Sequence, residues 1–332
     1  MSGLLIRADA RSIPLANDSG QCGVTSPPYW GLRDYGLEQG VWGDPSRDRQ
    51  GAVDACEHEW GYEPSKRRGI FCQRCGTWRG NLGLEPTPKL YVQHLVEIFR
   101  EVRRVLRPDG TVWLNLGDSY CGNSTGSDSN SSTLEGGKTT QREALKRPDK
   151  FGSGLKPKDL VGIPWRVAFA LQADGWWLRS DIIWEKPNPM PESVTDRPTK
   201  AHEYIFLLAK NERYYFDQDA VREITGREAT PEEYERADGH TMPSGNLKQG
   251  VNAGFGSKKS SLTHPSGRNI RSVWTIATQP YSGPHFATFP EKLVEPCILA
   301  GTSERGCCPK CGSPWARMIE RTGHVNKREA AH

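Results

Sequence analysis

The sequence predicts an α/β fold, and three consecutive stretches in its first half carry that prediction. Residues 89–106 place apolar side chains at three- and four-residue spacing, which is typical of an amphipathic helix. Residues 108–110 (Pro-Asp-Gly) indicate a turn that ends this helix, and the apolar run at 111–116 then predicts a buried strand. Helix, turn and strand in this order form one half of a doubly wound sheet with helices packed against it.

Further elements are predicted on either side of this unit. Two strands late in the first two thirds of the chain can pair as a hairpin, because only a proline-rich loop joins them. The predicted elements are a short buried strand at 4–6 closed by Arg7-Ala8-Asp9, a strand ending at Val24, a helix over 160–173 and the two hairpin strands at 177–184 and 203–208.

Length, charge and cysteine content narrow the class of protein. A chain of 332 residues can bury a full core as one large domain with insertions or as two domains. The net charge of +4 permits nucleic-acid binding without requiring it. No stretch of about 18 apolar residues occurs and the N-terminus lacks a secretory pattern, so neither a membrane span nor export is expected. Nine cysteines, several in Cys-x-x-Cys pairs, favour metal binding in a reducing compartment.

Residues 25–30 (Thr-Ser-Pro-Pro-Tyr-Trp) are the most informative segment of the chain. The two prolines fix φ and lack an N–H, so the segment is predicted to form a stiff bend at the end of a strand. We expect this bend to hold the Ser26 hydroxyl and two peptide carbonyls on one side, with Tyr29 beside them. Such a site can accept hydrogen bonds from the exocyclic amine of a nucleobase while the aromatic ring stacks on the base. For the motif alone, an ordinary proline turn remains open.

Six blocks of sequence occur along the chain in the order LLIRADA, TSPPYWGLRDYG, VLRPDGTVWLNLGDSY, DIIWEKPNPMPESV, HEYIFLLAK and HFATFPEKLVEPCI. Together they resemble the amino-group DNA methyltransferases of the permuted beta class, which use S-adenosylmethionine. The resemblance implies a Rossmann-like sheet with helices on both faces and double-stranded DNA as the substrate. It also implies a restriction–modification or phage setting, in the cytoplasm of a bacterial or phage-infected cell.

The resemblance assigns roles around the proline bend. Ser26 and the Pro27 carbonyl would accept the N–H bonds of the target amine, Pro28 would stiffen the bend, and Tyr29 would stack on a flipped base. Four further side chains are expected near the base or a phosphate, namely Trp30, Arg33, Lys186 and Asn188. Serine at the first position of the motif favours cytosine N4 as the target, and adenine N6 is the alternative.

A C5-cytosine mechanism would instead need a cysteine nucleophile after a proline. Pro296-Cys297 is such a pair, but its setting indicates a packed helix end.

The resemblance also predicts where the cofactor binds. Asp9 would meet the adenine ring, and the block at 285–290 would close over the methionine end through His285, Phe286, Thr288, Phe289 and Pro290. The family's glycine motif, Asp-Pro-Phe-x-Gly-x-Gly, is expected after residue 297 and is not in this sequence. A truncated or split zinc-containing DNA-binding fragment without activity of its own is therefore a second hypothesis, with a missing C-terminal portion or a partner chain supplying the motif. An RNA methyltransferase is a third.

The cysteines predict a structural zinc site. Cys56-x-His58 followed by Cys72-x-x-Cys75-Gly76 forms a Cys3His set on two short turns, which allows tetrahedral closure with no open position for water. A weaker second turn holds Cys308 and Cys311.

Composition shifts along the chain divide it into four parts. We expect a catalytic core from 1–30, 89–220 and 271–300, a zinc-binding insertion at 31–88, a target-recognition loop at 221–270, and a second cysteine turn with a polar tail at 301–332. The polar loop at 121–158 is a further candidate for DNA contacts.

Overall fold

The computed structural model describes residues 5–32, 34–43, 56–61, 70–121, 154–223, 268–281 and 288–318. The chain forms two compact units, which are described separately. The first unit combines residues 1–214 with 272–294, and the second combines residues 215–271 with 295–332.

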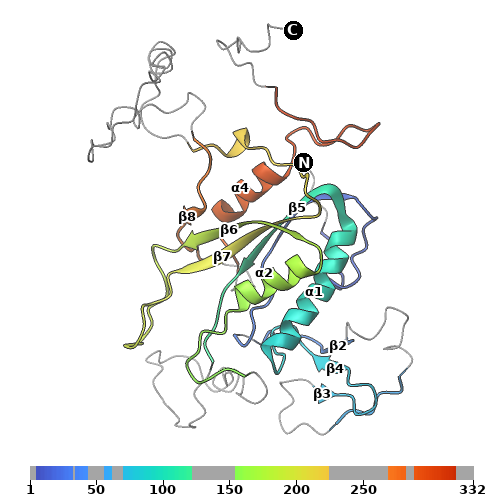
Figure 1. Cartoon of the computed structure of the whole chain (residues 1–332), viewed down its shortest axis with the longest axis vertical. Helices are drawn as coiled ribbons and strands as arrows, with labels where there is room; N and C mark the ends of the chain where they lie inside the picture. Colours follow the sequence, from blue (N-terminus) through green and yellow to red (C-terminus); the bar gives the residue numbers. More distant parts are fainter. Residues whose placement is uncertain are drawn as a thin grey trace, which may run out of the picture. The chain divides into compact units, whose positions relative to one another are not determined.

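A five-stranded mixed sheet forms the centre of the first unit (Figure 1). Its spatial order is β1 (Gly20–Thr25), β5 (Leu106–Leu116), β7 (His202–Ala209), β6 (Trp177–Glu185) and β8 (Val273–Thr275). Strands β1 and β5 run parallel, whereas β7 runs antiparallel to both β5 and β6. The predicted hairpin of β6 and β7 and the predicted strand at 111–116 are therefore confirmed.

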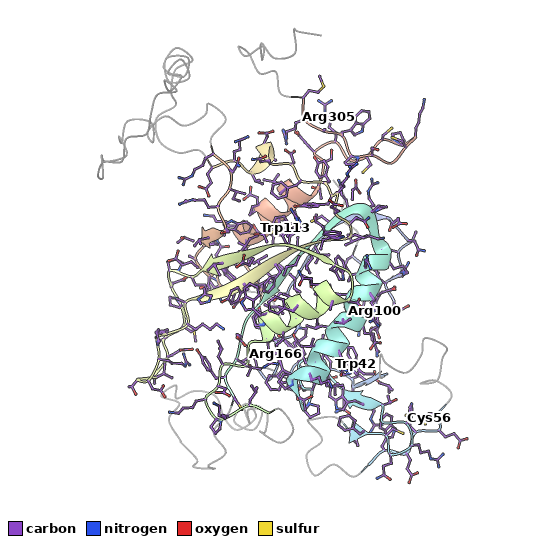
Figure 2. The ribbon with its side chains drawn as sticks, viewed as in Figure 1. Trp42, Cys56, Arg100, Trp113, Arg166 and Arg305 are labelled. Atoms are coloured by element: carbon purple, nitrogen blue, oxygen red, sulfur yellow. The ribbon has the colours of Figure 1, made fainter. Side chains whose placement is uncertain are left out.

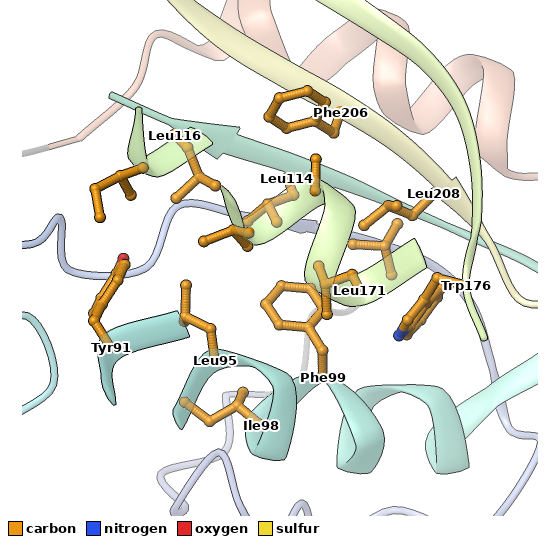
Figure 3. Close-up of a cluster of buried hydrophobic side chains, with 14 of the residues drawn as sticks. Tyr91, Leu95, Ile98, Phe99, Leu114, Leu116, Leu171, Trp176, Phe206 and Leu208 are labelled. Carbon is orange, nitrogen blue, oxygen red and sulfur yellow. The ribbon is translucent and has the colours of Figure 1, made fainter. Parts of the chain in front are cut away.

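Helices α1 (Pro88–Val105) and α2 (Ile163–Ala173) pack together against the sheet. The α1 helix begins where sequence chemistry places it, because the Thr87 hydroxyl accepts a 3.2 Å bond from the Leu90 N–H and Pro88 occupies the first turn. Figure 3 shows the apolar side chains of both helices meeting those of β5 and β7. The core residues at this junction include Leu95, Phe99, Leu114, Leu171, Phe206 and Leu208.

A second, three-stranded sheet lies in the region predicted as an insertion. It consists of β2 (Gly40–Trp42), β4 (Trp78–Gly80) and β3 (Ile70–Phe71), all antiparallel. Trp42 and Trp78 belong to the same buried cluster as the residues of α1, so this small sheet shares the core of the first unit. Figure 2 labels Trp42 beside α1 and Cys56 further out on the same side.

The second unit contains a short 3-10 helix, η1 (Asp219–Val221), and most of α4 (Glu291–Gly301). Asp217 accepts a 2.8 Å ion-pair bond from Arg317 and donates its own N–H to the Ala300 carbonyl at 2.8 Å. Cys297 is buried within α4, as the packed-helix interpretation of Pro296-Cys297 predicted. The predicted recognition loop at 221–270 lies mostly outside the described residues, as does most of 121–158.

Two predictions of local structure are wrong. Residues 5 and 6 form no strand, and the Leu5 side chain is 97% exposed, because so short an apolar run finds no neighbouring strand to pair with. Residues 108–110 do not end α1 as a separate turn. They bulge within β5, whose register moves from Gly20↔Leu106 to Cys22↔Thr111.

Gly110 allows this bulge to close tightly. A Cβ atom at position 110 would lie 3.0 Å from the carbonyl oxygens of both Arg107 and Gln21. None of the helices in the described ranges is long and apolar enough to cross a membrane.

Candidate catalytic site and metal-binding cluster

The register of the main sheet brings four segments to one edge. Thr25, the last residue of β1, lies near the carboxyl end of β5 through its pairing with Leu114. On the other side of β5, Leu116 pairs with Tyr204, and Glu185 at the end of β6 pairs with His202 at the start of β7. Four segments therefore meet: the bend after β1, the end of β5, the loop after β6 and the start of β7. They meet beyond the carboxyl ends of β1 and β5, which is where α/β folds bind their ligands.

Tyr29 is the centre of a hydrogen-bond network at this edge. The Ser26 hydroxyl donates to the Tyr29 oxygen at 3.2 Å. The Tyr29 hydroxyl lies 2.7 Å from Glu203 Oε2 and 2.9 Å from Asn115 Oδ1, and both oxygens can accept its proton. Glu203 also accepts a 3.1 Å bond from Asn115 Nδ2 and forms an ion pair with Lys186. A continuous chain of polar contacts thus runs from Ser26 to the Lys186 ammonium.

The network fixes the direction of the Ser26 proton. Because the Ser26 O–H points toward Tyr29, the lone pairs of its oxygen stay available to accept bonds from a ligand. Burial, together with the charge of the Glu203 carboxylate, raises the pKa of Tyr29 well above its ordinary value. Tyr29 therefore stays protonated at neutral pH and acts as a donor to Glu203.

Gly117 determines where the Tyr29 ring can lie. A Cβ atom at position 117 would sit 2.6 Å from Cε2 of that ring, which is closer than any real contact. The residue after β5 must therefore be glycine for the ring to occupy this place.

A layer of backbone contacts holds the bend from behind. The Tyr91 hydroxyl of α1 donates to the Pro28 carbonyl at 2.8 Å. The Trp30 indole N–H donates to the Glu85 carbonyl at 2.9 Å, and the Gly31 N–H donates to the Gly83 carbonyl at 2.8 Å. The bend is thus fixed through its backbone and through the Trp30 side chain. The Ser26 hydroxyl takes no part in these contacts and is bonded to Tyr29 instead.

The four predicted zinc ligands Cys56, His58, Cys72 and Cys75 come together in the structure. Their ligand atoms all lie within 4.8 Å of one another. The Cys75 Sγ lies 3.4 Å from His58 Nδ1, and the Cys56 and Cys72 sulfurs are 4.0 Å apart. Zn–S bonds of about 2.3 Å and Zn–N bonds of about 2.0 Å in a tetrahedron place neighbouring ligands about 3.5–3.8 Å apart, so the cluster has the right size for zinc.

Local hydrogen bonds shape the Cys72–Cys75 turn. The Cys72 N–H donates to Thr77 O at 2.8 Å, the Gly76 N–H donates to Cys72 O at 2.9 Å, and Gly76 has φ of 72°. Burial alone would raise the pKa of the Cys72 thiol, but bonds from the Cys75 N–H and from His58 lower it to about 6. The turn therefore favours a thiolate, which is the form of cysteine that binds zinc.

The Cys308–Cys311 turn has the same backbone geometry. The Cys308 N–H donates to Ser313 O at 2.8 Å, the Gly312 N–H donates to Cys308 O at 2.8 Å, and Gly312 has φ of 74°. In the part of the chain that the structure describes, the only cluster of three or more Cys, His, Asp or Glu ligand atoms is the first one.

Known proteins resemble this chain over most of its length. A family model described as DNA methylase, of the N6/N4 type, matches residues 21–308. The chain belongs to this DNA methylase family. The Type II methyltransferase M.Cfr9I of Citrobacter freundii is 40% identical over 300 residues, which are 90% of this chain and 72% of that protein. The Type II methyltransferase M.SmaI of Serratia marcescens is 39% identical over 311 residues, covering 91% of this chain and 76% of the relative.

Among solved structures, the chain is similar to the PvuII DNA methyltransferase (cytosine-N4-specific), with a TM-score of 0.43 and 14% identity. The match covers 87% of this chain and 66% of that one.

Three of the predicted site residues of this methylase chain have partners that change their interpretation. Trp30 is only 3% exposed and lies in the core, so its ring is not free to meet a base as predicted. Asp9 ends no strand, and its carboxylate binds Arg11 at 2.7 Å. Asn188 lies on an exposed loop, where its Oδ1 accepts the Thr278 N–H at 3.0 Å.

The remaining predicted residues of the cofactor and DNA sites are only partly described. Thr288 and Phe289 precede α4, and the buried Pro290 accepts the Leu293 N–H through its carbonyl at 2.9 Å. Arg33, His285 and Phe286 lie outside the described residues.

Sequence reasoning missed Glu203, Asn115 and Gly117. Asn115 carried a signal, because it is a polar residue inside the apolar run of β5. Glu203 carried none, since its place beside Tyr29 depends on the antiparallel pairing of β7.

Proposed function

We propose that this chain carries the catalytic centre for methyl transfer from S-adenosylmethionine to the exocyclic amine of a flipped base in double-stranded DNA, with cytosine N4 as the favoured target. The observation that supports it most is the Ser26–Tyr29–Glu203 network beside Pro27. That network presents an acceptor oxygen at the edge of the sheet, and membership of the DNA methylase family supplies the reaction class.

The chemistry needs acceptors more than it needs a nucleophile. The lone pair of the amine is drawn into the base, so the nitrogen attacks a methyl group poorly unless its hydrogens are held. Ser26 Oγ and the Pro27 carbonyl accept those two N–H bonds and favour a pyramidal nitrogen. The cofactor supplies an electrophilic methyl group. In the transfer the N–C bond would form as the C–S bond breaks, which would leave S-adenosylhomocysteine, and the methylated amine would release one proton to solvent.

Tyr29 contributes a fixed ring. Its hydroxyl is held by Glu203, and its ring lies against Gly117, so it loses little freedom when a base stacks on it. Such a stack stabilises a flipped base by roughly 1–3 kcal/mol. Lys186, Arg33 and Asn188 are proposed to meet the base or its phosphates.

The target base is tested by its product. Unmodified genomic duplex DNA is incubated with the chain and methyl-labelled S-adenosylmethionine, and the nucleosides are separated after digestion. Label in N4-methylcytosine supports the proposal, and label in N6-methyladenine supports the adenine alternative. In a parallel incubation with RNA, label that enters the RNA while none enters the DNA rejects both. Ser26→Ala should remove the label, whereas Ser180→Ala, at a half-buried position of β6, should not.

The cofactor site is proposed at residues 285–290. Thr288, Phe289, Pro290, His285 and Phe286 are proposed to line it. Asp9 would have to exchange its bond to Arg11 for the adenine ring.

Calorimetric titration with S-adenosylmethionine separates an active enzyme from a fragment that depends on another chain. Micromolar binding supports the first. No binding at millimolar concentration supports the second.

We also propose that the Cys56–His58–Cys72–Cys75 cluster holds a structural zinc ion. The four side chains would fill all four positions of a tetrahedron, which would leave no open position for water or substrate. The Cys308–Cys311 turn is proposed as a second, weaker zinc-binding element because its backbone is already formed as in the first turn.

Zinc content per chain tests both sites. Two equivalents in the wild type, and one in each of the double variants C72S/C75S and C308S/C311S, support both. A single equivalent that only C72S/C75S removes would leave the first site and reject the second.

A further inference from the structure

The buried pair of Glu85 and His94 has no part in the reaction as proposed. Both side chains are 0% exposed, and His94 Nδ1 lies 2.9 Å from Glu85 Oε1. Burial raises the pKa of the Glu85 carboxyl. Removing such a polar pair from water is costly, so its presence in the core calls for a physical explanation.

His94 connects α1 to the small sheet that carries the metal cluster. Its ring stacks on Trp42 of β2, at 4.5 Å, and on Trp78 of β4, at 5.3 Å, and both interplanar angles are below 25°. Trp78 directly follows Thr77, whose carbonyl accepts the Cys72 N–H at 2.8 Å. The metal-binding turn and the His94 ring are thus separated by one tryptophan.

Glu85 connects the same histidine to the catalytic bend. Its Oε2 accepts the Gly83 N–H at 2.8 Å, and its carbonyl accepts the Trp30 indole N–H at 2.9 Å. The Gly83 carbonyl in turn accepts the Gly31 N–H at 2.8 Å. Gly83 has φ of 91°, and a Cβ atom there would lie 3.1 Å from Tyr29 O, so this segment and the bend are in direct contact.

We propose that Glu85 and His94 are positioning residues that tie the metal-binding sheet to the catalytic bend. The path runs from Cys72 through Trp78, His94 and Glu85 to the backbone of residues 29–31. Folding of the small sheet around its metal then fixes the bend in the geometry in which Ser26 meets its ligand. The metal half of this path rests on the proposed zinc site, whereas the Glu85 half rests on hydrogen bonds within the described chain.

Hydrogen exchange at the Gly31 amide measures the tie directly, because that amide is bonded to Gly83. Glu85→Ala leaves both the Gly83 N–H and His94 without their acceptor. We expect exchange at Gly31 to rise about tenfold in the full chain, the effect of losing roughly one hydrogen bond. Glu85→Gln should restore slow exchange, since its amide oxygen can accept from Gly83 and its NH2 can donate to His94.

A matched control separates this effect from general destabilisation. Glu101 lies on α1, the helix that carries His94, and it accepts bonds from Arg104 and from the Ile13 N–H at 2.9 Å, away from the bend. Glu101→Ala should leave Gly31 unchanged. If Glu85→Ala does not fold, Glu85→Asp takes its place, because its shorter side chain cannot reach Gly83 and His94 together.

Removing the metal tests the other half of the path. Chelation that empties the site by elemental analysis should speed Gly31 exchange in the wild type and add little in Glu85→Ala. Unchanged exchange in the zinc-free wild type would overturn the link to the metal, and unchanged exchange in Glu85→Ala would overturn the role of Glu85. A chain that binds no zinc rejects the zinc proposal itself, which the Glu85 variants do not depend on.

Discussion

The two cysteine turns of this chain share a backbone but differ in their surroundings. Both begin with a cysteine N–H that donates to the carbonyl five residues later, and both place glycine at φ near 70°. The turn at Cys72 meets Cys56 and His58 and leads into the buried Trp78. The turn at Cys308 leads into Trp315, which is 51% exposed. Local sequence thus builds the turn, while distant residues build a complete ligand set around only one of them within the described chain.

The largest difference is expected from truncating the tryptophan that follows each turn. Trp78→Ala removes a ring that is 1% exposed and stacked on His94, which should cost about 3–5 kcal/mol of unfolding free energy. Trp315→Ala removes a half-exposed ring and should cost about 1 kcal/mol or less. Urea unfolding followed by circular dichroism measures both, and equal losses would show that the two turns are embedded alike.

Metal removal should also distinguish the two turns by its effect on stability. A structural ion that is present at a thousand times its dissociation constant stabilises the folded state by about 4 kcal/mol, so chelation should lower the melting temperature of the wild type clearly. In the variant C72S/C75S, chelation should have a much smaller effect. If the chelator does not change the melting temperature of the wild type, the ion has no structural role.

Substituting the glycine of each turn should instead have a similar effect on both turns. Gly76 and Gly312 have φ of 72° and 74°, where an L-residue costs about 1–2 kcal/mol. Gly76→Ala and Gly312→Ala are therefore expected to raise hydrogen exchange of their own turns by similar factors. A Gly76 variant with several times the effect of the Gly312 variant would mean that the metal, rather than the backbone, sets the cost.

The smallest expected effect concerns one side-chain bond. The Thr77 hydroxyl lies 3.1 Å from Cys75 Sγ, and Thr77→Val removes that contact while keeping the shape of the side chain. Zinc affinity measured by competition with a chelator should fall about tenfold, the lower end of the range for losing a partner of a metal ligand. An unchanged affinity would show that the backbone of the turn alone orients Cys75.

The sequence predicted those parts of the molecule that depend on local chemistry. The spacing of apolar residues located α1 to within one residue at each end, and the prolines at 27 and 28 placed a bend after β1. The Cys-x-x-Cys spacing selected four residues that do meet in space. Each of these signals comes from residues that are close together in the sequence or from the chemistry of one residue type.

What the sequence left out depends on pairing between distant strands. Glu203 reaches Tyr29 because β7 runs antiparallel to β5, and nothing in its own neighbourhood indicates that register. Leu5 and Ile6 have the composition of a strand, but they form none because no neighbouring strand pairs with them. Trp30 looks like a base-stacking residue, but it is buried in the core cluster, and its indole N–H donates to the Glu85 carbonyl.

The Tyr29 network has a consequence for how the chain folds. Its hydrogen bonds join residues 86 and 174 positions apart in sequence. Contacts of such long range form only after the intervening loops have closed, so they are absent from early, locally ordered states and arrive with the last steps of sheet assembly. The geometry of the proposed catalytic site is therefore expected to form late in folding, and a spectroscopic probe on the Tyr29 hydroxyl would report the assembly of β1, β5 and β7.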